Sequence, residues 1–165
     1  ACLPQFLCLL EQFWFDDAEL RTLRLHRTVD EVPRVSFILD HPNNAGVGDV
    51  LAVPAYNTSE DRLQFHPRER EDCGYVLTIG GTRIYIAGDG ENTPEMKALH
   101  GIDIAFLPVN QPYTMTVDQA VDAVKAIRPA IFYPYHYGEV EEKTDIDRLS
   151  RELTDVTEIR IRPME

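Results

Sequence analysis

A series of short apolar segments, separated by turns and helix-like segments, restricts this chain to a layered arrangement of strands and helices. β-Branched and aromatic residues dominate the segments, which makes each of them a predicted strand. Gly80-Gly81, between two of them, is a two-residue hairpin signature. The predicted strands cover residues 34–39, 50–53, 75–79, 82–87, 103–108, 130–133 and 158–162.

Helices are predicted between these strands. The clearest covers residues 116–127, because Thr116 and Gln119 have the spacing of a capping box and the apolar residues share one face. A shorter helix begins at Pro94, and another covers residues 144–153. Strands that alternate with helices predict an α/β fold.

The 165 residues are predicted to form a single domain, 1–165, long enough to bury a core. The sharper signals lie in residues 49–165, and residues 1–48 form an atypical N-terminal segment. Within that segment, residues 1–33 have a helix-like apolar pattern. Residues 40–48 are rich in Pro, Asn and Gly, which predicts a loop.

The chain is acidic, with 28 Asp and Glu against 16 Lys and Arg and a formal net charge of -12. Such a chain repels phosphate backbones, so no nucleic acid is expected to bind. A small phosphate-bearing molecule remains compatible, because a bound metal ion reverses the potential locally. A small-molecule substrate is the expected partner, and the net charge does not exclude one that bears phosphate.

The cysteines and the N-terminus suggest a compartment. Cys2, Cys8 and Cys73 are odd in number and lack C-x-x-C spacing, so we interpret them as reduced thiols and expect a cytoplasmic location. The apolar opening residues lack a basic region and fall short of the ~20 residues that span a bilayer. Neither a targeting segment nor membrane contact is expected.

Three potential metal ligands, His66, Asp89 and His136, follow apolar segments. Asp89 and His136 come just after predicted strands, whose carboxyl ends share a rim in layered α/β folds. His66 lies in the loop after residues 50–53. Two histidines and a carboxylate suit a hydrolytic metal ion.

Each candidate also has a structural interpretation. Asp89 is compatible with an ordinary turn before a helix, His136 with a packed residue among tyrosines, and His66 with a surface residue. Asn57 and Tyr135 are predicted to bind substrate, although both are equally compatible with structural roles.

Several short motifs occur in order between residues 49 and 138. They are Val53-Pro54-Ala55-Tyr56-Asn57, Phe65-His66-Pro67, Gly74-Tyr75-Val76, residues 83–89, Pro94-Glu95-Met96, residues 103–109, residues 113–116 and Pro134-Tyr135-His136-Tyr137-Gly138. In this ordered set the chain resembles the metallo-β-lactamase-fold, metal-dependent hydrolases, in the branch that includes ascorbate-6-phosphate lactonase-like proteins.

The resemblance implies an αββα sandwich with zinc or another divalent metal ion at the rim between two sheets. It implies that His66 belongs to a first metal site, that Asp89 bridges two ions, and that His136 completes the second site. Asp89 and His136 would then be the catalytic residues, with a metal-bound hydroxide attacking a carbonyl or phosphorus centre.

The chain departs from that family in two places. No His-x-His-x-Asp-His motif occurs before residue 60, and Gly90 stands where the family usually has Thr. Three ligands can hold one catalytic metal ion, so at most one complete site is expected. The sandwich is also expected to be truncated or incomplete in its N-terminal half.

Two functions therefore stay open. One is a metal-dependent hydrolase acting on a small ester, lactone or phosphoester. The other is a catalytically inactive derivative or fragment that serves as a binding or assembly module. Zinc is the expected metal, with manganese or iron as alternatives. An incomplete sandwich exposes apolar surface, which favours a homo-oligomer.

Overall fold

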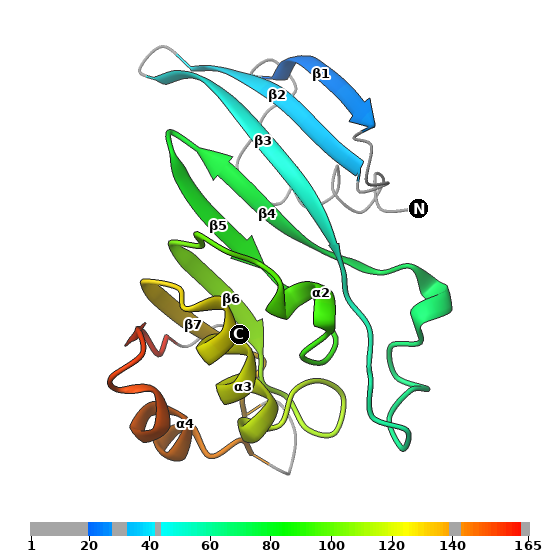
Figure 1. Cartoon of the computed structure of the whole chain (residues 1–165), viewed down its shortest axis with the longest axis vertical. Coiled ribbons are helices and arrows are strands. Elements are labelled where there is room, and N and C mark those ends of the chain that lie inside the picture. Colours follow the sequence, from blue (N-terminus) through cyan, green and yellow to red (C-terminus); the bar gives the residue numbers. More distant parts are fainter. Residues whose placement is uncertain (1–19, 28–32, 42–43, 139–142, 163–165) are drawn as a thin grey trace.

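The computed structural model describes residues 20–27, 33–41, 44–138 and 143–162. Within them, eight strands form one sheet whose spatial order follows the sequence (Figure 1). Neighbours from β1 to β5 pair antiparallel, and neighbours from β5 to β8 pair parallel. The strands are β1 (Leu20–Arg27), β2 (Pro33–His41), β3 (Asn44–Pro54), β4 (Cys73–Ile79), β5 (Thr82–Ile86), β6 (Ile104–Pro108), β7 (Ile131–Tyr135) and β8 (Glu158–Ile159).

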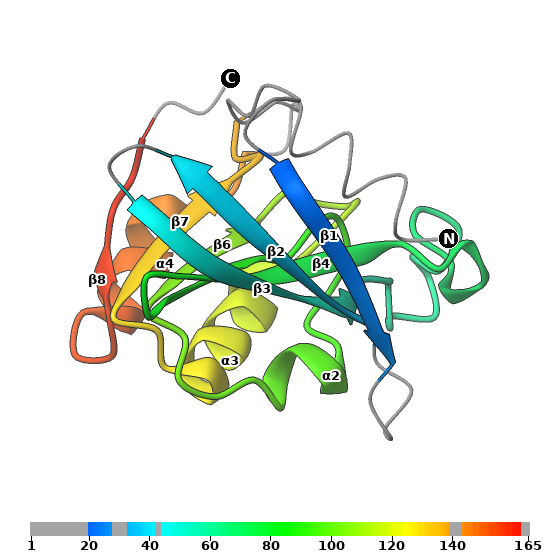
Figure 2. The ribbon, with the colours of Figure 1, turned by 90° about the horizontal axis from the view of Figure 1, so that it is seen from above.

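The helices connect the parallel strands, as a parallel sheet requires. They are α2 (Pro94–Lys97), α3 (Val117–Ile127) and α4 (Ile146–Leu153), and a short 3-10 helix, η1 (Arg68–Arg70), precedes β4. α2 and α3 lie against one face of the sheet, and α4 packs beside α3 (Figures 1 and 2). The prediction of an α/β fold is confirmed.

The core forms between the sheet and α3. One row of side chains crosses four neighbouring strands in register, and each member is at most 1% exposed: Val76, Tyr85, Ala105 and Phe132. α3 faces this row with its apolar side, and its predicted capping box between Thr116 and Gln119 is present. The helix is thus fixed both by its own first turn and by burial of one face.

In the N-terminal segment, the strand predicted at residues 34–39 is confirmed by β2, but the helix-like and loop predictions are wrong where the structure describes them. Residues 20–27, expected in a helix-like segment, form β1, and the loop expected at residues 40–48 is largely strand. β2 and β3 stay paired up to His41 and Asn44. Cross-strand pairing has overridden the local preferences for helix and turn. The remainder of the helix-like pattern, in residues 1–19 and 28–32, lies outside the described residues.

The expectation of reduced cysteines is wrong for Cys73, which is disulfide-bonded. In the part of the chain that the structure describes, no helix has the length and apolar character needed to cross a membrane.

Candidate functional site

The three predicted metal ligands line one cavity of about 330 Å³. His66 comes from the loop between β3 and η1, Asp89 from the segment after β5, and His136 is the first residue after β7. The other lining residues are Phe65, Asn110, Tyr113 and Thr114. Residues that are far apart in the sequence therefore share one small cavity.

Sheet topology explains why three of these segments meet. β5, β6 and β7 are parallel neighbours, so their carboxyl ends lie at the same edge of the sheet. Asp89 follows the first of these strands, Asn110 the second and His136 the third. The sequence predicted that Asp89 and His136 lie at this common rim and left open whether they converge there. The arrival of the His66 loop at the same edge depends on tertiary contacts.

His136 has an unusual backbone conformation. Its φ of 61° is left-handed, a region that non-glycine residues seldom occupy and that is often found at functional sites. In this conformation its Nε2 lies 3.4 Å from Oδ1 of Asp89. The end of β7 therefore turns the imidazole toward the carboxylate that follows β5.

The electrostatics of the site depend on these contacts. The hydrogen bond from His136 holds the pKa of Asp89 below its ordinary value, with further help from the charges of His136 and His66. Burial lowers the pKa of His66, although the nearby Asp89 carboxylate opposes that effect. At neutral pH the site thus presents an ionised carboxylate and a neutral imidazole.

The donor set fits part of a divalent-cation site. Nδ1 of His66 is buried without a hydrogen-bond partner, so it is available as a ligand. Imidazole and carboxylate together suit zinc, manganese or iron. However, in residues 20–27, 33–41, 44–138 and 143–162, no three His, Cys, Asp or Glu side chains are gathered into a complete metal-binding group. The described residues therefore supply a partial ligand set, in which Asp89 and His136 are already in contact.

The two predicted substrate-binding residues do not line the cavity. Asn57 is 1% exposed, and its Nδ2 donates to the carbonyl oxygens of Arg62 and Tyr113, at 2.9 Å each. The hydroxyl of Tyr135 donates to the carbonyl oxygen of Gly88. Both side chains hold neighbouring segments in place, and the geometry adds no support to direct substrate contact.

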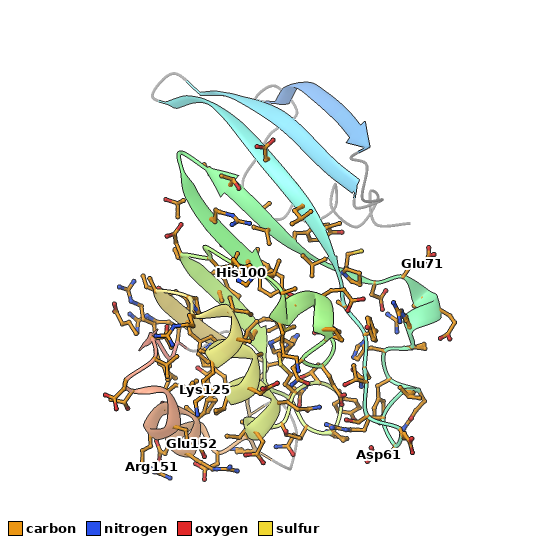
Figure 3. The ribbon with its side chains drawn as sticks, in the orientation of Figure 1. Asp61, Glu71, His100, Lys125, Arg151 and Glu152 are labelled. Carbon is orange, nitrogen blue, oxygen red and sulfur yellow. The ribbon has the colours of Figure 1, made fainter. Side chains whose placement is uncertain are left out.

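Other residues line the cavity beside the three candidate ligands. Phe65 and Tyr113 meet edge to face, with ring centroids 4.9 Å apart, at the side of the cavity. Oδ1 of Asn110 is buried without a partner. The motif Phe65-His66 and the segment after β6 were the available signals in the sequence. His100, by contrast, lies in the segment after α2 and does not line this cavity (Figure 3).

The chain belongs to the family described as the beta-lactamase superfamily domain, whose model matches residues 21–136. It is similar to a UPF0173 metal-dependent hydrolase of Symbiobacterium thermophilum, with 44% identity over 46% of this chain and 38% of that protein. Among solved structures, it resembles a candidate metal-dependent hydrolase of Parabacteroides distasonis. That match has 53% identity and a TM-score of 0.64, and it covers 72% of this chain and 52% of the other.

A metallo-β-lactamase-fold protein of Bacillus subtilis matches with 14% identity and a TM-score of 0.53, over 74% of this chain and 50% of that one. The prediction of a metallo-β-lactamase-like fold is confirmed. The chain spans between 38% and 52% of the length of these three proteins.

Proposed function

We propose that this chain is a metal-dependent hydrolase that acts on a small ester, lactone or phosphoester. One observation carries the proposal: His66, Asp89 and His136 line a single cavity, and the Asp89 carboxylate touches His136. The names of the relatives from Symbiobacterium and Parabacteroides support metal dependence and hydrolysis.

His66, Asp89 and His136 would hold the metal ion. A divalent cation supplies acidity to a bound water and polarises a carbonyl or phosphoryl oxygen. The lowered pKa of Asp89 keeps its carboxylate ionised at neutral pH, which is the form that binds a cation. His66 is kept neutral by burial, which is also the form that binds a metal. We expect zinc, with manganese or iron as alternatives.

The other residues that line the cavity would bind substrate. A volume of about 330 Å³ admits a small molecule. The unpartnered Oδ1 of Asn110 can accept a hydrogen bond from a substrate hydroxyl or amide. Phe65 and Tyr113 offer ring surface to an apolar group.

A second candidate is a catalytically inactive member of the family that serves as a binding or assembly module. It is favoured by the lack, among the described residues, of a gathered group of three potential ligands. The two candidates differ in whether the chain retains metal.

The deciding experiment is elemental analysis of the purified chain after dialysis against buffer containing zinc. The hydrolase proposal predicts about one equivalent of metal, because three ligands form at most one site. His136→Ala should reduce that content sharply, whereas His100→Ala, which removes a histidine outside the cavity, should leave it unchanged. Failure of the unmodified chain to retain zinc or manganese would favour the inactive module.

A further inference from the structure

Glu91 is a buried carboxylate two residues beyond Asp89. Its side chain is 0% exposed, and Oε2 accepts four hydrogen bonds from the turn that follows β3. The donors are the backbone N–H and hydroxyl of Thr58, at 2.8 Å each, and the backbone N–H and hydroxyl of Ser59, at 2.7 and 2.9 Å. Its other oxygen, Oε1, lies 2.9 Å from Nη2 of Arg62.

A buried carboxylate with these partners stabilises one conformation strongly. Burial of a charge is unfavourable unless it is paired and hydrogen-bonded, and Glu91 has both kinds of partner. Hydrogen bonds to an ionised acceptor are also stronger than those between neutral groups. The turn at residues 58–62 is therefore fixed to the segment that carries Asp89.

The same turn leads to His66. The N–H of Asn57 donates to the carbonyl oxygen of His66 at 2.8 Å, and the N–H of Glu91 donates to the carbonyl oxygen of Tyr56 at 2.9 Å. Residues 56 and 57 thus lie between the Asp89 segment and His66, with a backbone hydrogen bond on each side. Displacement of residues 56 and 57 would therefore move His66 relative to Asp89.

Arg62 extends the connection to the third side of the cavity. Its Nη1 donates to the carbonyl oxygen of Thr114 at 3.2 Å, and Nη2 donates to the hydroxyl of Ser59 at 2.7 Å. Thr114 lines the cavity. The pair of Glu91 and Arg62 therefore joins the segments that bear Asp89, His66 and Thr114.

We infer that Glu91 is a positioning residue, which acts through Thr58, Ser59 and Arg62 to hold His66 and the wall at Thr114 in place around Asp89. The part of this inference that concerns metal affinity rests on the proposed function. The part that concerns the position of the His66 loop does not.

The first test is amide hydrogen exchange, residue by residue, on the chain without added metal. In Glu91→Gln, which keeps the size of the side chain and removes its charge, the amide of Asn57 should exchange about tenfold faster or more. The amides of β6 and β7 should keep their protection. Leu149→Val is the matched control, because it loosens the core under α4 away from this loop. An unchanged rate at Asn57, or an equal acceleration in Leu149→Val, would overturn the inference.

If Glu91→Gln does not fold, Thr58→Val takes its place. It removes the one hydrogen bond from the Thr58 hydroxyl and leaves the charge of Glu91 paired. The amide of Asn57 should still exchange faster than in the wild type, and an unaltered rate would contradict the positioning role.

The second test is a double-mutant cycle on zinc affinity, measured by calorimetry. Glu91→Gln should weaken zinc binding by about 10- to 100-fold, but it should have little further effect when His66 is already replaced by Ala. Full additivity would show that Glu91 does not act through His66. If the wild-type chain binds no zinc, the proposed function fails, and hydrogen exchange at Asn57 still decides the role of Glu91.

Discussion

Gly90 provides the sharpest test of how the site is packed. It stands between Asp89 and Glu91, where the resemblance to the family led us to expect Thr. A Cβ at this position would lie 2.7 Å from the backbone nitrogen of Tyr56 and 3.0 Å from its carbonyl oxygen. Both are backbone atoms of the segment that Glu91 holds, so they cannot move aside as a flexible side chain would.

The expected effect of Gly90→Ala can be estimated from that geometry. Forced overpacking of this kind costs roughly 1–3 kcal/mol, and a φ of 157°, which L residues rarely adopt, adds to it. Gly80→Ala is the control, because Gly80 also has a positive φ, of 56°, but has nothing within 4 Å of the added Cβ. Its cost is the left-handed conformation alone, about 1–2 kcal/mol.

Urea denaturation followed by far-UV circular dichroism measures both variants. With slopes of about 1–3 kcal/mol per molar urea, an extra loss of ~2 kcal/mol lowers the midpoint of Gly90→Ala by about 1 M relative to Gly80→Ala. Gly90→Thr should be less stable still. If Gly90→Ala were as stable as Gly80→Ala, the close packing of the Asp89 segment on Tyr56 would be refuted.

Further predictions concern pH, helix capping, substrate contact and assembly. Burial lowers the pKa of His66 below 6.5, so below that pH the unfolded chain takes up a proton that the folded chain does not. Stability should therefore fall as the pH drops below 6.5, and His66→Gln should show a smaller loss in urea titrations between pH 7.5 and 5.5. Thr116→Ala removes the hydroxyl that caps α3 and should lower the free energy of unfolding by about 1 kcal/mol in urea denaturation. The control Thr154→Ala, which lies outside any N-cap, should lower it by less. Asn110→Ala should raise KM for any ester or phosphoester that the chain hydrolyses and leave zinc content unchanged, and a loss of zinc would instead make Asn110 a ligand. Light scattering should give a mass above that of one chain at micromolar concentration, and a monomer at every concentration would contradict the predicted homo-oligomer.

Much of the fold between β4 and α4 could be predicted from local patterns. The glycine pair between β4 and β5, the capping box at Thr116 and the apolar face of α3 are encoded by neighbours in the sequence, and all three are present. Strands in layered α/β folds share a carboxyl edge, so the sequence also predicted that Asp89 and His136 lie at a common rim, whereas their contact was seen only in the structure. The ligand roles of these residues remain predictions.

Other features were decided only by contacts between residues far apart in the chain. β1 and the extended β2–β3 pair formed where local composition favoured a helix and a loop, because strand pairing satisfied the backbone over a longer span. Asn57 was predicted to bind substrate, with a structural role as the alternative, and it is buried with the carbonyl groups of Arg62 and Tyr113 as its partners. Glu91 gave no local signal, since its partner Thr58 is 33 residues away. The sequence by itself indicated three candidate metal ligands and the strands that Asp89 and His136 follow. The tertiary structure decided that His66 reaches the cavity of Asp89 and His136, that Gly90 packs against the backbone of Tyr56 and that Glu91 is buried against Thr58 and Ser59. Close approach and the burial of a charge are properties of segments brought together by folding.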